Sequence, residues 1–207
     1  NGIRCVGKYL YDNGMTDGRT TITVDTLSGV KTLELTVEDG KMVSARVDMG
    51  AAILKPADIP VDMEGDTVIG APIVVDEKVY HMTCVSMGNP HCVIFLDEDI
   101  DGLDLERIGP KFEHHALFPE RVNTEFVNVL PDGTLKMRVW EPGSGETWAC
   151  GTGACAVGVA AVLTGRAQKG EDITVHLRGG DLTVRYTDQT VFMTGAATTV
   201  FKGEIEL

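Results

Sequence analysis

The sequence predicts an α+β fold built from two similar lobes, and three observations support this prediction. Short strand patterns separated by turn signals fill most of the 207 residues. Two helical patterns lie among them, one at residues 2–12 and one from Cys150 to about residue 163. The two helices also share a glycine spacing at one constant offset, which matches Gly2, Gly7 and Gly14 to Gly153, Gly158 and Gly165. We therefore expect one central helix in each lobe.

The first lobe begins with the helix at residues 2–12. Val6, Tyr9 and Leu10 share one face of this helix, and Asn13-Gly14 is a helix-stop signal. Strand patterns follow at residues 20–26, 31–38 and 42–48. Asp39-Gly40 predicts a tight hairpin between the last two strands. The proline-bearing connection at residues 50–60 is the expected domain boundary.

The second lobe contains the remaining patterns. A helix is expected at residues 103–115, and the Cys150 helix follows later in the chain. Strands are expected at residues 79–87, 92–96, 123–130, 134–141, 173–177, 182–186 and 191–194, and a last strand at residues 198–206 belongs to the first lobe. Turn residues separate most of them, as at Pro131-Asp132-Gly133.

Composition limits the classes of partner and setting. The net charge of −13 argues against nucleic acid, because phosphate binding needs clustered Lys and Arg. No apolar run is long enough to span a bilayer, so no membrane partner is expected. The five cysteines are an odd number and form no Cys-x-x-Cys pair, so we expect no metal site and a reduced, cytoplasmic setting.

Cys150 is the most informative residue, because it stands directly before Gly151-Thr152-Gly153 and an apolar helical run. A thiol at a helix start meets unpaired N–H groups and the positive end of the helix dipole. We therefore expect a lowered pKa for the Cys150 thiol, which would make it a usable base or nucleophile. The glycines let the backbone approach an anion such as a substrate carboxylate.

The glycine spacing shared by the two helices also predicts where a second thiol would lie. The offset between the two helices sets the counterpart of Cys150 at position −1, ahead of Asn1. We therefore expect the chain to be N-terminally truncated, with a Cys-Gly pair or similar before Asn1.

Four further segments are informative: residues 1–9 (NGIRCVGKY), 87–93 (MGNPHCV), 123–127 (NTEFV) and 143–156 (GSGETWACGTGACA). With these four segments in this order, the chain closely resembles the diaminopimelate epimerase family. The resemblance covers essentially the whole chain, as the C-terminal three quarters of the family pattern. It implies two pseudo-symmetric lobes, each a β-barrel around a central helix, with the first lobe incomplete here. Residues 1–48 plus 197–207 would belong to the first lobe and residues 49–196 to the second.

The resemblance implies inversion of an amino-acid α-carbon without a cofactor, with LL- to meso-diaminopimelate, in lysine and peptidoglycan-precursor biosynthesis, as the expected reaction. Removing a proton from one face and returning one to the other requires two opposed acid/base groups, and thiols suit both tasks. The resemblance implies that Cys150 is one of the pair and that the thiol at position −1 is the other. It also implies that Glu141 pairs with Cys150 and that His91 pairs with the absent cysteine.

The resemblance further implies substrate contacts. Backbone N–H groups of Asn1, Gly2, Gly151 and Thr152 would bind the α-carboxylate, and Asn89 and Asn123 would hold the far end of a small amino-acid substrate. Each has a simpler interpretation: His91 and the asparagines as ordinary turn residues, and Glu141 as a solvated carboxylate at a strand end. A homodimer is left open.

One departure from the family pattern is Pro142, which stands directly after Glu141 where the family usually has an arginine that binds the distal carboxylate. It keeps open a racemase or isomerase of the same fold for another substrate, such as proline or hydroxyproline. A cysteine hydrolase or acyltransferase that uses Cys150 with His91 is a further alternative. The last alternative is that the chain is inactive because it lacks one catalytic cysteine.

Overall fold

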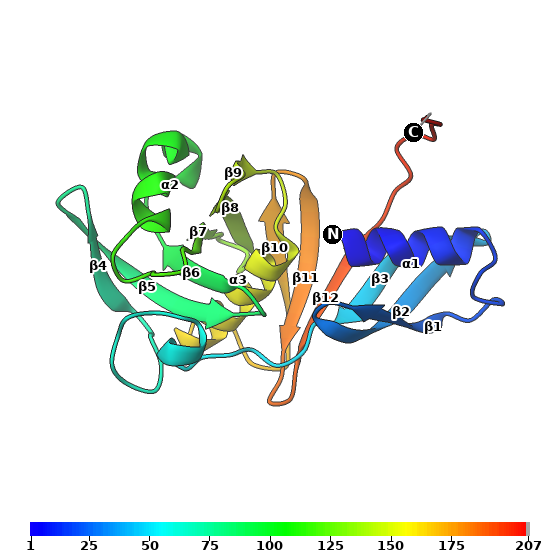
Figure 1. The fold of residues 1–207 in the computed structure, drawn as a ribbon, viewed down its shortest axis with the longest axis horizontal. Helices are drawn as coiled ribbons and strands as arrows, with labels where there is room; N and C mark the ends of the chain where they lie inside the picture. Colours follow the sequence, from blue (N-terminus) through cyan, green and yellow to red (C-terminus); the bar gives the residue numbers. More distant parts are fainter. Residues whose placement is uncertain (206–207) are drawn as a thin grey trace. The chain divides into compact units, whose positions relative to one another are not determined.

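The computed structural model describes residues 1–205 and divides into two compact units. The first contains Asn1–Asp48 and the described chain from Thr194 onward, and the second contains Met49–Met193. Both combine helices with antiparallel strands, which confirms the α+β class (Figure 1). The predicted assignment of residues 1–48 plus 197–207 and 49–196 to epimerase lobes stays a prediction.

The first unit is a helix on a strand meander. The helix α1 is Gly2–Asp12, and the strands are β1 (Thr21–Thr26), β2 (Gly29–Glu38) and β3 (Lys41–Asp48). The strands pair in order with antiparallel neighbours, and α1 packs mainly on β3. Its core consists of buried side chains on β2 and β3, among them Leu33, Met42 and Val47.

The second unit is a sheet that surrounds a helix. Its strand order is β11-β10-β8-β7-β6-β5-β4, with β9 paired to β8, and neighbours are antiparallel except at β10–β8 and β6–β7. The strands of this unit are β4 (Ala71–Val75), β5 (Lys78–Ser86), β6 (Pro90–Phe95), β7 (Asn123–Val129), β8 (Leu135–Glu141), β9 (Gly145–Thr147), β10 (Asp172–Leu177) and β11 (Gly180–Tyr186). The strand β12 (Val191–Ala196) begins here and continues into the first unit.

The helix α3 (Gly151–Leu163) forms the centre of the second unit. Almost every residue of its first three turns is buried, and it contacts β5, β6, β7, β10 and β11. A helix that is apolar all round must be enclosed on every side, so the strands lie around it (Figure 1). The first turn of α3 lies against β7, where a Cβ on Gly153 would be 2.6 Å from Glu125 Oε1.

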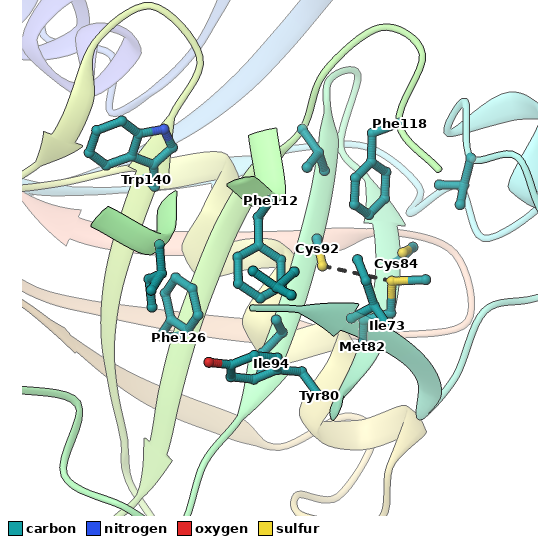
Figure 2. Packing of buried hydrophobic residues seen from close by; sticks show 14 of the residues in the cluster. Ile73, Tyr80, Met82, Cys84, Cys92, Ile94, Phe112, Phe118, Phe126 and Trp140 are labelled. Carbon is teal, nitrogen blue, oxygen red and sulfur yellow. Dashed lines mark hydrogen bonds between the residues drawn. The ribbon is translucent and has the colours of Figure 1, made fainter. Parts of the chain in front are cut away.

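A second apolar cluster lies under the helix α2 (Leu105–Glu113). Phe112 is at its centre, with its ring edge-on to Tyr80 at 5.2 Å and to Phe126 at 5.4 Å (Figure 2). The Glu113 carboxylate accepts a hydrogen bond from Trp140 Nε1 at 2.7 Å and one from Arg121 Nη1 at 2.9 Å. These contacts fix α2 on β8, the strand that ends at Glu141.

The glycine spacing shared by α1 and α3 has a physical basis. A Cβ on Gly7 would lie 2.8 Å from Leu33 Cδ2, and one on Gly158 would lie 2.6 Å from Val184 Cγ1. In each helix, therefore, a glycine allows a close approach to a side chain of a neighbouring strand. Gly14 and Gly165, which follow the helix ends, both have left-handed φ angles, 74° and 73°.

One predicted strand is wrong, and two observed strands were not predicted. Residues 198–205 form no strand, so the one expected at 198–206 is wrong over its described part; residue 206 lies outside the described residues. The strands β4 and β9 were not predicted. The alternation in β4 is short and interrupted by Pro72, and β9 has only three residues.

Candidate active site

Cys150 occupies the N-cap of α3, as the sequence predicts. Its backbone is extended, with φ −126° and ψ 108°, and its Sγ accepts a hydrogen bond from the Gly153 N–H at 3.4 Å. The Thr152 hydroxyl lies 3.6 Å from the same sulfur. Only 6% of Cys150 is exposed. The sulfur atom is therefore held by the first turn of the helix with little freedom to move.

The lowered pKa expected for this thiol is wrong. Burial is the largest influence, and with the charges of Glu125 and Glu141 it raises the pKa of Cys150 to about 12, although the bonds from Thr152 and Gly153 act in the opposite direction. The helix terminus is outweighed because the thiol is buried and because the charges of two carboxylates, from β7 and β8, act on it as well. Cys150 is therefore a neutral thiol, a proton donor, in this state.

Glu141 lies at the end of β8, just before a tight turn. The Ser144 N–H donates to the Glu141 carbonyl at 3.1 Å, and Gly143 has φ 74°. Pro142 and Gly143 thus fill the two central positions of a type II turn, where proline and glycine are favoured. The Thr147 hydroxyl donates a short bond to Glu141 Oε1, across the β8–β9 hairpin. Pro142 therefore stiffens the turn that positions this carboxylate.

Glu141 influences Cys150 through its charge. No hydrogen bond among residues 1–205 joins the two side chains, so the predicted pairing is electrostatic in this state. A carboxylate near a thiol makes its thiolate a stronger base, because the negative charge disfavours loss of the proton.

His91 is fully buried at the start of β6, and both of its ring nitrogens are engaged. Nδ1 lies 2.7 Å from Glu125 Oε1, and Nε2 lies 3.2 Å from Asn89 Oδ1. No hydrogen bond among residues 1–205 joins the His91 ring to Cys150. A cysteine hydrolase that uses His91 as the direct base of Cys150 therefore finds no support here.

Glu125 is the residue that sequence reasoning missed. It is fully buried in β7, and its Oε2 atom is buried without a hydrogen-bond partner among the described residues. The sequence offered no clear signal, because Glu125 stands between polar and apolar residues in β7 and only the structure shows that it is buried. The parallel register of β6 and β7 pairs His91 with Asn123 and so brings Glu125 beside the ring.

The two asparagines lie beside this pair. The Asn89 Nδ2 donates to Thr152 Oγ1 at 3.3 Å, and the Asn123 Nδ2 donates to the Pro90 carbonyl at 2.8 Å. Asn89 is half-buried and Asn123 is buried. Their predicted contacts with the far end of a substrate stay predictions.

The remaining predicted residues divide between the units. Gly151 and Thr152 start α3, next to Cys150. Asn1 and Gly2 belong to the first unit, where Asn1 Oδ1 accepts a bond from Arg4 Nη2 at 2.8 Å. Their predicted role in carboxylate binding stays a prediction. A groove of about 900 Å³ in the first unit, between α1 and the chain from Ala197 to Gly203, contains none of the predicted catalytic residues.

Two features are absent from residues 1–205. No group of three or more His, Cys, Asp or Glu side chains there is arranged to hold a metal ion. No helix in the same residues is long and apolar enough to cross a membrane.

Gly153→Ala is expected to destabilise the second unit by about 1–3 kcal/mol, since overpacking a buried site costs that much. A Cβ at this position would lie 2.6 Å from Glu125 Oε1 and 3.2 Å from Cys150 Sγ. Urea unfolding measures the change. Gly102→Ala is the matched control, because its Cβ meets nothing within 4 Å, and we expect a change below about 0.5 kcal/mol. Equal stability of the two variants would contradict the close approach of α3 to Glu125.

Comparison with known proteins identifies the family. The family model described as diaminopimelate epimerase matches residues 83–200, which is more than half of the chain. A diaminopimelate epimerase of Acetivibrio thermocellus is 54% identical over 209 residues, covering 100% of this chain and 73% of its own length. One from Agathobacter rectalis is 53% identical and one from Methanococcus maripaludis is also 53% identical, each with all of this chain and 74% of the relative covered.

Solved structures of similar fold are more distant in sequence. A hydroxyproline epimerase from Agrobacterium vitis with bound trans-4-hydroxy-L-proline has a TM-score of 0.72 at 16% identity, covering 95% of this chain and 62% of that one. A probable proline racemase from Agrobacterium radiobacter has a TM-score of 0.75 at 16% identity, covering 99% and 66%. At this identity the likeness concerns the fold alone. The sequence relatives decide the assignment: the chain belongs to the diaminopimelate epimerase family.

Proposed function

We propose that this protein is an isomerase that converts LL- into meso-diaminopimelate by a two-thiol acid/base mechanism, a step that would serve lysine and peptidoglycan-precursor synthesis. The observation that carries the proposal is Cys150 at the N-cap of α3, with the Thr152 hydroxyl and Gly153 N–H on its sulfur and carboxylates nearby. Membership of the family gives the substrate.

In the proposed mechanism Cys150 begins as the proton donor. A base on the opposite face, by resemblance the thiol at position −1, removes the α-proton, and the Cys150 S–H returns a proton to the other face. The carbanion is far more basic than a thiolate, so a thiol whose pKa is about 12 still transfers its proton. In the reverse direction the same raised pKa makes the Cys150 thiolate a stronger base.

The charge that builds on the substrate carboxylate needs fixed donors. The N–H groups of Gly151 and Thr152 are the first of α3, and the helix geometry leaves them without intrahelical partners. We propose that they bind the α-carboxylate and stabilise the developing negative charge. In this proposal neither pyridoxal phosphate nor a metal ion takes part.

We also propose a reducing, cytoplasmic setting, supported by the five cysteines, all free thiols in the described part of the chain. The partner in this proposal is a small amino-acid substrate, with no nucleic acid and no membrane. A homodimer stays a prediction.

A direct assay tests the proposal. The full-length protein, with no pyridoxal phosphate added, should convert LL-diaminopimelate into the meso isomer, measured by chiral chromatography. Racemisation of proline or hydroxyproline without conversion of diaminopimelate would overturn the proposed substrate in favour of the second candidate. That candidate is favoured by Pro142, which removes the arginine expected to bind the distal carboxylate.

Pro142→Arg is expected to lower KM for diaminopimelate about tenfold with little change in kcat, because a charged hydrogen bond to a carboxylate contributes about 1.5–3 kcal/mol. Loss of the proline should also destabilise the turn by about 0.4–1 kcal/mol. Steady-state kinetics and thermal unfolding measure the two effects. An unchanged KM would mean that the distal carboxylate does not reach residue 142; Pro131→Arg, in another β-turn, is the control.

A further inference from the structure

The strongest feature that the proposed function leaves unexplained is the buried carboxylate of Glu113, the last residue of α2. Only 7% of its side chain is exposed. Its Oε2 accepts a hydrogen bond from Trp140 Nε1 at 2.7 Å, and its Oε1 accepts one from Arg121 Nη1 at 2.9 Å. An indole N–H and a guanidinium N–H can only donate, so the direction of both bonds is fixed. One carboxylate thus joins two separate segments of the chain.

The Glu113 carboxylate is charged. Burial alone would raise the pKa of this carboxyl group, but the bonds from Trp140 and Arg121 outweigh burial and hold the pKa below its ordinary value. A buried ion pair is weak evidence for stability, because apolar residues of similar volume often hold a fold as well. Stability alone therefore does not account for this charge.

We propose that Glu113 is a positioning residue of the active site, which fixes the start of β7 at Asn123 and the end of β8 at Glu141. No hydrogen bond among residues 1–205 joins Glu113 to either residue, so it acts through Arg121 and Trp140. The inference rests on the proposed function only for the roles of Asn123 and Glu141 in epimerisation.

Trp140 carries the effect of Glu113 to Glu141. Its indole ring has little freedom, because a Cβ on Gly109 of α2 would lie 2.3 Å from Cδ2 and one on Gly145 of β9 would lie 3.4 Å from Cη2. The bond to Glu113 holds the indole nitrogen, drawn in blue in Figure 2. Neighbouring residues of a strand point to opposite faces, so a fixed Trp140 also fixes the direction of the next side chain, Glu141.

Arg121 carries the effect of Glu113 to Asn123. It has φ 68°, in the left-handed region that a non-glycine residue rarely adopts. Its backbone N–H donates to the Phe118 carbonyl at 3.0 Å, which closes the turn before β7. Such a conformation persists only where the surroundings hold it, and the bond to Glu113 is one of these restraints. A relaxed turn would displace Asn123, two residues later.

Alkylation of Cys150 reads the effect on Glu141 without an assay of activity. Burial and the charges of Glu125 and Glu141 raise the pKa of this thiol to about 12. In Glu113→Gln one acceptor oxygen cannot serve both donors, so Glu141 should move and act less on the sulfur. At about pH 9, Cys150 of the full-length variant should alkylate about threefold faster than in the wild-type protein, a fall in pKa of about half a unit. Glu106→Gln, exposed on the same helix, is the control and should leave the rate unchanged.

A double variant separates positioning from a general loosening of the fold. If Glu113 acts through Glu141, Glu113→Gln should add nothing to the alkylation rate in a Glu141→Gln background. If Glu113 only keeps the unit closed, the two changes should act independently and their effects on the rate should multiply. A multiplied rate, or an unchanged rate in Glu113→Gln alone, would overturn the inference.

Arg121→Gln tests the effect on Asn123 in a variant that leaves the buried bond between Glu113 and Trp140 intact, since about half of the Arg121 side chain is exposed. KM for diaminopimelate should rise about fivefold, with a smaller change in kcat, because one hydrogen bond to a charged group no longer holds the turn. Arg121→Lys keeps a charged donor and should recover most of this loss. An unchanged KM in Arg121→Gln would overturn the role of Glu113 at Asn123.

The outcomes separate this inference from the proposed function. If Cys150→Ser retained epimerisation while Glu113→Gln accelerated alkylation only in the presence of Glu141, the proposed function would fail and the positioning role would stand. If Cys150→Ser was inactive while Glu113→Gln alkylated at the wild-type rate, the function would stand and the inference would fail.

Discussion

Cys150→Ser is expected to reduce epimerisation of diaminopimelate by about 10²- to 10⁴-fold, the contribution of a positioned acid/base group. Serine is a favoured N-cap residue, so its hydroxyl can accept the Gly153 N–H that the sulfur accepts now. The variant should therefore keep the start of α3 and lose the chemistry, because a serine hydroxyl holds its proton far more tightly than a thiol. Chiral chromatography of the products measures the loss.

Cys5→Ser is the matched control for this prediction. Cys5 is an exposed thiol on α1, so its replacement tests the loss of a cysteine without touching α3. We expect activity within about twofold of the wild-type protein, because surface substitutions rarely matter. Near-normal turnover by Cys150→Ser, with circular dichroism unchanged, would remove Cys150 from the mechanism.

Glu141→Gln is expected to slow the conversion of meso- into LL-diaminopimelate, the direction in which Cys150 acts as the base, by about 10²-fold and to lower the pKa of Cys150. Burial, Glu125 and Glu141 together raise this pKa to about 12, so neutralising Glu141 removes one of the three causes. The glutamine oxygen still accepts the Thr147 hydroxyl, which keeps the hairpin closed. A thiolate of lower pKa is a weaker base, and the step in which Cys150 takes the α-proton becomes slower.

The sign of the shift can be measured at the sulfur. Alkylation of Cys150, followed by mass spectrometry of its peptide, should accelerate at a lower pH in Glu141→Gln than in the wild-type protein. Glu106→Gln, on the exposed side of α2, is the control and should leave the profile unchanged. An alkylation profile that moves to higher pH in Glu141→Gln would show that Glu141 favours the thiolate.

The local sequence is sufficient to predict the helices and most of the strands. The helix start at Cys150 follows from a thiol before glycines and an apolar run, and the structure begins α3 at Gly151. The strand predicted at residues 198–206 is wrong over its described part. Its β-branched residues favour a strand, but they form one only where a neighbouring strand accepts their hydrogen bonds.

The electrostatics of the site could not be predicted in the same way. The helix terminus beside Cys150 is visible in the sequence, but the carboxylates that oppose it come from β7 and β8, through a register that local patterns do not encode. The same register joins His91 to Glu125, two residues 34 positions apart. The burial of Glu125 therefore could be seen only in the fold, because the residues around it in β7 are a mixture of polar and apolar types.

The origin of the hydrogen delivered to the inverted carbon tests the central claim most directly. Diaminopimelate is incubated with the full-length protein in heavy water and examined by mass spectrometry after the first few per cent of turnover. Two opposed thiols predict product that carries one deuterium at the inverted centre and recovered substrate that carries almost none, because the donor on the product side exchanges with solvent. Product that retains its original hydrogen would contradict the account, since a single base would then serve both faces.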